Sequence, residues 1–285
     1  MFLNNGYAII MMIKIFRKGK KIMKRISTGI ENFKELLDNN YYYVDKTKLI
    51  EDVLSDKVML YTRPRRFGKT LNMSMLYYFF SNKEKENAYL FDGLYISRQQ
   101  EAKSYQNQYP VIFLTLKDMN NNNFQSQVYK FSSIIAGIID KYPDVINSSL
   151  LNNRDKIWLE KYHNLEANID ELKEALYNIS IFLNKHYGKK VILLIDEYDV
   201  PLQSAYNNGY YDEMVDFLRS MFSSALKTND ALERGILTGC LRISKESIFT
   251  GLNNFTVRNI TDKEASDCFG FTQKEIDDLL KYYDL

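Results

Sequence analysis

The chain has 285 residues, which suits one large domain, and its 45% hydrophobic and 26% charged residues are ordinary globular values that exclude a disordered tail or a fibre. The 38 basic and 36 acidic residues are too balanced to argue by themselves for nucleic acid or a membrane surface as a partner. Two Cys cannot form a disulfide framework, which fits a reducing cytoplasm, and with only two His they argue against a zinc site.

The N-terminal segment is basic and contains no acidic residue before Arg25. Its apolar run, residues 7–13, is too short to span a bilayer, and the basic cluster follows this run, which is the reverse of a secretory signal. The segment is either a short basic amphipathic element or upstream sequence with Met23 as the natural start. We favour the second interpretation, so residues 1–22 are expected to be a dispensable leader of a cytoplasmic protein with no membrane partner.

Short apolar runs then alternate with helical patterns along the chain. Strands are expected at Val58–Tyr61, Val111–Leu116, Val191–Ile195, Gly235–Thr238 and Phe255–Ile260. Helices are expected at Leu71–Phe80, from Ile169 to Leu183 and from Met214 to Ala225. The first three strands are almost continuously apolar, as strands buried on both faces should be. The alternation predicts an α/β fold with a parallel sheet between two layers of helices, in which ligands bind at the carboxyl ends of the strands.

A basic loop follows the first expected strand and precedes a helix: Thr62-Arg-Pro-Arg-Arg-Phe-Gly-Lys-Thr70. Its end fits the phosphate loop, or Walker A motif, G-x-x-x-x-G-K-[ST]. Gly68 would let backbone N–H groups turn toward phosphates, Lys69 would neutralise the β- and γ-phosphates, and the Thr70 hydroxyl would bind Mg²⁺. Arg63 stands where the first Gly belongs and weakens the match, because Arg is strained at positive φ. An ordinary basic turn is the alternative.

The whole loop and the start of its helix are candidate nucleotide-binding residues: Arg63, Pro64, Arg65, Arg66, Phe67, Gly68, Lys69, Thr70 and Leu71. Arg65 and Arg66 would contact phosphates or a nucleic acid. A solvated loop position is the alternative, and it is slightly favoured for Arg65.

The third expected strand runs into Asp196-Glu197-Tyr198-Asp199. An apolar strand that ends in Asp-Glu is typical of the second half of a nucleoside-triphosphatase site, the Walker B motif. Asp196 would hold Mg²⁺ through water, and Glu197 would orient and deprotonate the attacking water. Asp199 supports this site or caps the next segment. A solvated acidic turn is the alternative, but the two motifs together predict a nucleoside triphosphatase in which Lys69 and Glu197 are catalytic.

Two further candidate catalytic residues follow the fourth expected strand. Thr238 would lie between Glu197 and the γ-phosphate and sense it, or it simply closes the strand. Arg242 would stabilise charge in the transition state, or it forms a surface salt bridge.

Several phrases occur in a fixed order from about Met23 to the end of the chain: Tyr43–Thr47, Arg63–Thr70, Leu194–Asp199, Leu237–Ile243, Ser244–Asn254 and Phe269–Thr272. With them the sequence resembles the AAA-ATPase-like proteins of bacteria. The resemblance implies a P-loop ATPase with a three-layer α/β/α fold and a mostly parallel five-stranded sheet of order 5-1-4-3-2, the additional-strand, catalytic-Glu type. It also implies that Arg63 in place of Gly belongs to the family's own pattern.

The resemblance also bears on the domains. Residues 23–270 are expected to form the ATPase domain, and residues 271–285 to begin a truncated helical C-terminal region, whose Thr272 and Glu275 form a capping box. Members of the family often carry a C-terminal domain similar to restriction nucleases. The residues of this chain do not include that domain, so nuclease function is not carried over to them. A C-terminal domain or a partner protein is expected to supply what is missing.

The segment before the first strand often lies near the nucleotide base in related ATPases. We extend this as a hypothesis to Val44, Lys46 and Thr47, with a turn packed against the sheet as the favoured alternative. The guanine-reading N-K-x-D pattern is missing, which favours ATP. The expected function is Mg²⁺-dependent binding and hydrolysis of ATP. The alternatives are a nucleotide-binding regulatory module with little turnover in a defence or signalling protein, and the ATPase half of a DNA-processing nuclease system.

Overall fold

A computed structural model of the chain describes residues 23–241, 248–249 and 255–285. The expected leader at residues 1–22 lies outside the described residues. None of the helices that the described residues form has the length and hydropathy that a membrane span requires.

Five strands form one sheet in which every neighbouring pair is parallel. The strands are β1 (Val58–Thr62), β2 (Val111–Thr115), β3 (Val191–Asp196), β4 (Leu232–Gly239) and β5 (Phe255–Arg258). Their order across the sheet is β2-β3-β4-β1-β5, which is 5-1-4-3-2 when read from the β5 edge. All carboxyl ends therefore meet at one edge, where the ligands of parallel sheets bind.

The expected strands are all present, and their ends differ by a few residues. β4 begins three residues before Gly235, because Leu232 pairs with Val191 across a local shift in register. β5 ends at Arg258, the last residue that pairs with β1, because Asn259 enters a turn closed by its N–H bond to Asp262.

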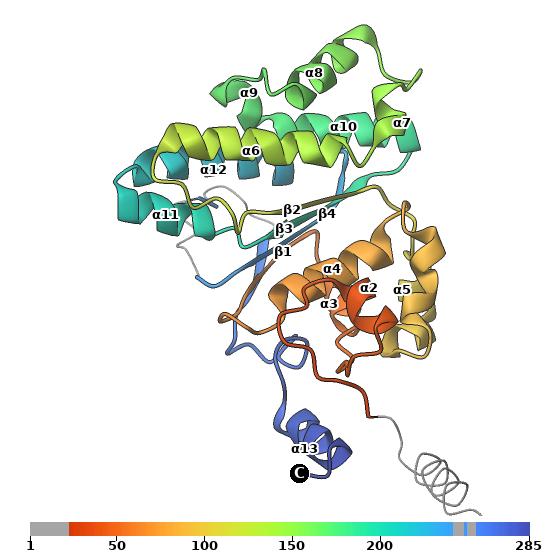
Figure 1. Cartoon of the computed structure of the whole chain (residues 1–285). Helices are drawn as coiled ribbons and strands as arrows, with labels where there is room; N and C mark the ends of the chain where they lie inside the picture. The colour runs from red at the N-terminus through yellow and green to blue at the C-terminus, as the bar shows by residue number, and fades with distance from the viewer. Residues whose placement is uncertain (1–22, 242–247, 250–254) are drawn as a thin grey trace, which may run out of the picture.

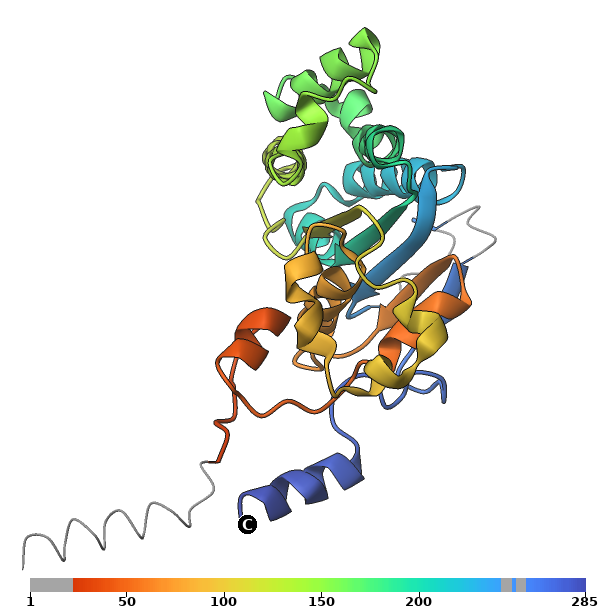
Figure 2. The ribbon, with the colours of Figure 1, turned by 90° about the vertical axis from the view of Figure 1, so that its right-hand side faces the viewer.

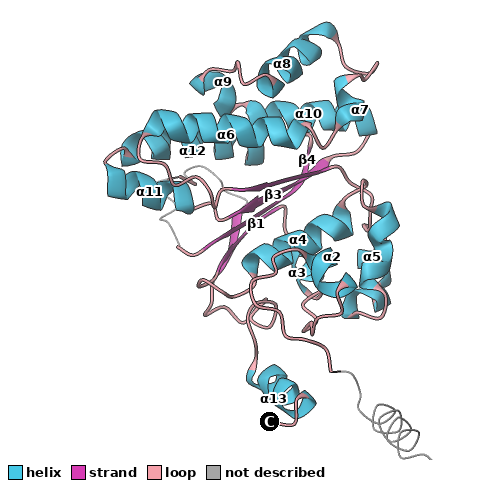
Figure 3. Ribbon diagram, viewed as in Figure 1, coloured by secondary structure: helices cyan, strands magenta, loops and turns pink. Residues whose placement is uncertain are grey.

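Helices cover both faces of the sheet (Figures 1 and 3). On one face lie α6 (Phe124–Ile139), α10 (Ala175–Tyr187), α11 (Val200–Asn208) and α12 (Tyr211–Leu226), with α7 (Pro143–Ile146), α8 (Asn153–His163) and α9 (Ile169–Lys173) around them. On the other face lie α4 (Lys69–Phe80), α2 (Phe33–Asp38), α3 (Leu49–Ser55), α5 (Gln100–Lys103) and the 3₁₀ helices η1 (Lys85–Phe91) and η2 (Tyr95–Arg98). α8 and α9 lie outside α6 and α10, farther from the sheet (Figure 2).

The buried strands alternate their side chains between two hydrophobic cores. In β3, Leu193 and Ile195 pack on the α10–α12 side, whereas Ile192 and Leu194 pack on the α4 side. Both sets are fully buried, which explains why β3 reads as a continuous apolar run. This arrangement fixes β3 and α4 against each other, so the residues at their adjoining ends are held in place.

One helical prediction needed correction, and several helices were not predicted. The single helix expected from Ile169 to Leu183 is broken at Glu174 into α9 and α10. Leu172 and Leu176 are buried on either side of the break, so the apolar spacing continues through it and reads as one helix. The prediction also missed α6, although Asn123 caps it by accepting the Ser126 N–H and its buried residues recur at helical spacing.

The last helix, α13 (Gln273–Tyr282), begins with the expected capping box. The Thr272 hydroxyl accepts the Glu275 N–H, and the Glu275 carboxylate accepts the Thr272 N–H at 2.7 Å. α13 extends beyond the carboxyl edge of the sheet, apart from both helical layers (Figures 1 and 2), and none of its residues is fully buried.

Candidate active site

The phosphate loop joins the end of β1 to the start of α4. Gly68, the N-cap of α4, has φ 75° and Arg66 has φ 68°, so two left-handed residues flank Phe67. Gly68 adopts this conformation without steric cost, whereas Arg66 is strained in it. Residues 65–71 line a cavity of about 880 Å³. This volume is within the range of sites that bind small molecules and cofactors.

Lys69 lies at the centre of the loop with its side chain only 3% exposed. Its Nζ is 3.2 Å from the carbonyl oxygens of both Arg63 and Pro64, so the loop wraps around the amine. The same Nζ is 3.2 Å from Glu197 Oε1. Lys69 therefore joins the phosphate loop to the acidic end of β3.

Asp196 is the last residue of β3 and is fully buried. Its Oδ2 accepts a hydrogen bond from Thr70 Oγ1 at 2.8 Å, and its Oδ1 accepts one from Thr238 Oγ1. Burial raises the pKa of Asp196, while the bonds from Thr238 and Thr70 act in the opposite direction. The two motifs recognised in the sequence therefore meet directly, through Thr70 and Asp196.

Glu197 lines the cavity and has φ 56°, a left-handed conformation that costs a residue other than Gly on the order of 1–3 kcal/mol. Burial raises the pKa of its carboxyl group, although Lys69 acts in the opposite direction. A strained backbone and a raised pKa at a cavity wall are both typical of functional sites.

Cys240 is a cavity residue that the sequence analysis did not include in the site. Its Sγ is 3.2 Å from Lys69 Nζ and 3.8 Å from Glu197 Oε2. The Asp199 carboxylate accepts the backbone N–H groups of Cys240 at 3.2 Å and Leu241 at 3.0 Å. Asp199 therefore holds the chain after β4 against the site. The position of Asp199, three residues after Asp196, was the sequence signal that it supports the site.

Arg63 was expected to contact the nucleotide, but its side chain is not at the cavity. Its guanidinium is buried and donates to the carbonyl oxygens of Thr62, Arg258 and Ala265 at 2.9, 2.8 and 3.2 Å. It also lies over the Phe269 ring, 4.9 Å from its centroid. The positive φ expected at Arg63 occurs at Arg66 instead. Arg63 thus fixes the base of the loop from behind.

Three other candidate site residues are Thr238, Pro64 and Arg242. Thr238 was expected between Glu197 and the γ-phosphate, but it is buried behind Asp196 and donates to that carboxylate. Pro64 presents its carbonyl oxygen to Lys69, and its side chain is exposed outside the cavity lining. Arg242 lies outside the described residues.

The cavity has two further walls that the sequence analysis only partly anticipated. One is formed by residues 26–31 and 42–44 with Lys46, and the other by Gly270, Phe271 and Leu279. Val44 and Lys46 thus line the cavity, and their place near a nucleotide base stays a prediction. Thr47 is not among the lining residues, because its hydroxyl is turned toward Asp45, to which it donates at 2.6 Å.

Comparisons with known proteins agree with the family resemblance. A family model described as "Predicted AAA-ATPase" matches residues 27–249. A protein of Azotobacter chroococcum mcd 1, described as "Uncharacterized protein in vnfD 5'region", is 27% identical over 258 residues, which cover 89% of this chain and 44% of that protein. The chain therefore spans less than half the length of this relative. No solved structure gives a significant match.

Proposed function

This chain belongs to the predicted AAA-ATPase family, and from that premise we propose that it binds ATP with Mg²⁺ in the cavity beside the phosphate loop and hydrolyses it. One observation carries the proposal. Thr70 Oγ1 lies 2.8 Å from Asp196 Oδ2, and Lys69 Nζ lies 3.2 Å from Glu197 Oε1, at the carboxyl edge of a parallel sheet. Two motifs that are 126 positions apart thus supply a phosphate-binding cation, two oxygen ligands for a metal and a second carboxylate in one place.

The sheet supports the additional-strand, catalytic-Glu class in particular. β4 lies between the phosphate-loop strand β1 and the acidic strand β3. Glu197 follows the acidic strand directly and lines the cavity. In this class the carboxylate after the acidic strand activates the water.

Lys69 would bind the terminal phosphates. Its Nζ is bonded to two loop carbonyl oxygens and paired with Glu197. Phosphate oxygens would replace the partners on the cavity side, since a charge-assisted bond to phosphate is stronger than one to a neutral carbonyl. The start of α4 adds backbone N–H groups and the positive end of the helix dipole.

Thr70 and Asp196 fit Mg²⁺ in their chemistry, because a hydroxyl and a carboxylate are the hard oxygen ligands that this ion prefers. Among the described residues no group of three or more acidic, His or Cys side chains could hold a metal alone. The ion would therefore need phosphate and water oxygens as well, as Mg²⁺ usually does at nucleotide sites. When bound, it would neutralise charge on the β- and γ-phosphates.

Glu197 would act as the general base. Its carboxylate accepts a proton from water as the water oxygen forms a bond to the γ-phosphorus, and the bond from that phosphorus to the β–γ bridging oxygen breaks, leaving ADP and phosphate. Thr238 would hold Asp196 in place from behind. Lys69, beside Glu197, would balance charge on the transferred group.

Of the two alternatives, the DNA-processing one loses support at the loop. This alternative would be favoured by a basic face built on Arg63, Arg65, Arg66 and the N-terminal basic cluster. Arg63 is buried and Arg65 and Arg66 are exposed, whereas residues 1–22 of the cluster lie outside the described residues. The absence of the guanine-reading pattern still favours ATP over GTP.

The direct test is phosphate release by the full chain. We expect ATP turnover in the presence of Mg²⁺ and its loss when EDTA removes the ion, because Thr70 and Asp196 would hold the ion but carry no positive charge of their own to neutralise the phosphates. Repeating the assay with DNA tests the DNA-processing alternative, which requires DNA to stimulate phosphate release. Absence of ATP binding, measured by calorimetry, would contradict the proposal.

The pH dependence of turnover tests the base assignment. Glu197 works only when ionised, and burial raises its pKa above the usual value of 4.5, so kcat/KM should fall toward acid with a midpoint above that value. The measurement is kcat/KM across the acid range. In Glu197→Gln this acid limb should disappear from the residual rate. A limb that persists there would assign the titration to Asp196, whose pKa is also raised by burial.

A further inference from the structure

The chain after β5 is bonded directly to the phosphate loop. Gly270 N–H donates to the Phe67 carbonyl oxygen at 3.0 Å, and Asn72 Nδ2, one turn into α4, donates to the Cys268 carbonyl oxygen at 2.8 Å. Gly270 has φ 65°, and a Cβ there would lie 2.9 Å from Phe67 Cδ1, so only glycine fits this contact. These C-terminal residues lie beyond residue 249, where the family match ends.

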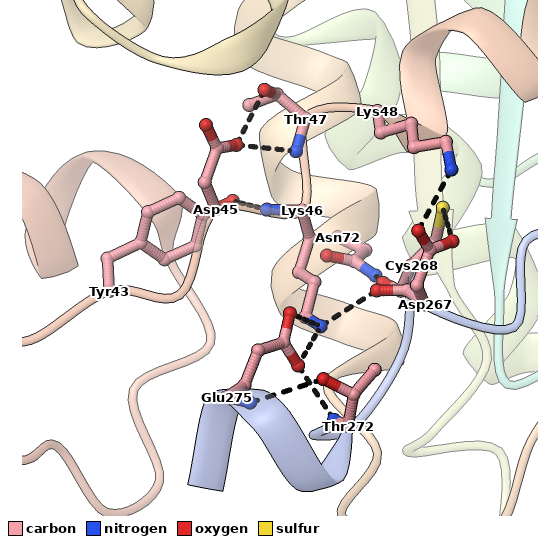
Figure 4. A network of polar contacts seen from close by, with 10 residues as sticks. All are labelled: Tyr43, Asp45, Lys46, Thr47, Lys48, Asn72, Asp267, Cys268, Thr272 and Glu275. Atoms are coloured by element: carbon pink, nitrogen blue, oxygen red, sulfur yellow. Dashed lines mark hydrogen bonds and ion pairs between the residues drawn. The ribbon is translucent and has the colours of Figure 1, made fainter. Parts of the chain in front are cut away.

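Lys46 attaches α13, the helix that follows Gly270, to the segment before α3 (Figure 4). Its side chain is 8% exposed, and its Nζ lies 2.7 Å from both carboxylate oxygens of Glu275 and 2.7 Å from the Asp267 carbonyl oxygen. A buried ammonium group requires such partners, because desolvation without them is costly. A second, exposed pair joins Lys48 to Asp267 at 2.9 Å.

α13 is also attached at its far end. None of its residues is fully buried, and its far end is held by the Tyr282 hydroxyl, which accepts the Lys24 N–H at 3.0 Å, and by the Tyr42 ring, 4.9 Å from that of Tyr282. Tyr42 and Lys46 both line the cavity, as do Phe271 and Leu279 on the C-terminal side. The cavity wall therefore includes both the segment that holds α13 and residues before and within this helix, so a ligand that fills the cavity could contact both.

We infer that Lys46 and Glu275 are positioning residues of the nucleotide site: their ion pair holds α13 as a wall of the cavity and couples ATP binding to the position of this helix. The inference rests on the proposed function. A ligand that binds better when the wall is in place stabilises that position, and by reciprocity the pair strengthens binding of the ligand.

Glu275→Gln tests the pair with little other change. Gln can keep the capping box, so α13 retains its N-terminal bonds while the charge opposite Lys46 is removed. We expect the Kd of a non-hydrolysable ATP analogue with Mg²⁺ to rise ~10-fold, within the usual range of coupling between sites. Asp278→Asn removes the same charge from an exposed position of α13 and should leave Kd unchanged.

A second measurement is the effect of ATP on amide hydrogen exchange of residues 273–282. An ion pair with only a structural role would not make this exchange depend on ATP. ATP with Mg²⁺ should slow exchange in α13 of the wild-type protein and of Asp278→Asn, and the effect should be lost in Glu275→Gln. The wild-type comparison needs no variant, so it holds even if Glu275→Gln folds poorly.

The outcomes separate the two proposals. If the wild type binds ATP but exchange in α13 does not respond, or if Glu275→Gln binds as tightly as wild type, the inference is wrong while the proposed function stands. If the wild type does not bind ATP, the proposed function fails and the inference fails with it.

Discussion

Lys69→Ala should abolish measurable binding of ATP with Mg²⁺. Lys69 is the cation around which the phosphate loop is wrapped, and its Nζ is bonded to the carbonyl oxygens of Arg63 and Pro64. Alanine leaves these oxygens and the Glu197 carboxylate without their cation, so the variant presents negative potential where the phosphates should bind. The expected loss is ~100-fold or more in affinity, because each hydrogen bond from a charged group contributes roughly 1.5–3 kcal/mol.

Calorimetry with purified wild type and variant would measure this loss, and a melting curve would show that the variant is folded. Lys103→Ala is a suitable control, because Lys103 is an exposed residue of α5 that does not line the cavity. An unchanged Kd in Lys69→Ala would remove the phosphate-loop assignment, since the dipole of α4 alone would then be sufficient.

The strands and the two motifs could be predicted because their signals are local. β3 is buried on both faces, so its apolar run is continuous, and Asp196 and Glu197 follow it without interruption. The phosphate loop likewise occupies nine consecutive residues, 62–70, which run from the end of a strand into a helix. In a parallel sheet such strand ends meet at one edge. Local patterns were therefore enough to predict that Thr70 lies near Asp196.

The roles of Arg63 and Thr238 could not be predicted, because they depend on long-range contacts. Arg63 binds carbonyl oxygens 195 and 202 positions away, and no sequence pattern shows that its side chain turns under the loop. Thr238 lies one residue before the end of β4, but only the pairing of β3 with β4 decides that its hydroxyl meets Asp196.

The C-terminal wall shows the same limit. The capping box of α13 predicted where the helix begins, yet it gave no sign that Glu275 also pairs with Lys46, 229 positions earlier in the chain. Lys46 was placed near the ligand by analogy, and its burial against Glu275 became visible only in three dimensions.

Glu197→Gln should separate ATP binding from hydrolysis. Gln keeps the size of the side chain and can still contact Lys69, but it cannot accept a proton from water. Thr70 and Asp196 are untouched, so ATP should bind with nearly the wild-type Kd while phosphate release falls ~10²-fold or more, the usual scale for loss of a general base. Turnover like that of wild type would place the base elsewhere.

Asp196→Asn is the matched comparison, because it makes the same chemical change at the adjacent residue. Asp196 is fully buried between the hydroxyls of Thr70 and Thr238, so Asn there removes a metal ligand and leaves both hydroxyls with a neutral partner. Here the Mg²⁺ dependence of binding should weaken together with the rate. If Glu197 is the base and Asp196 the metal ligand, the Kd for ATP, measured with and without Mg²⁺, should change in Asp196→Asn and not in Glu197→Gln. If wild type binds ATP tightly but releases no phosphate, the intact Glu197 serves a nucleotide-binding switch with little turnover.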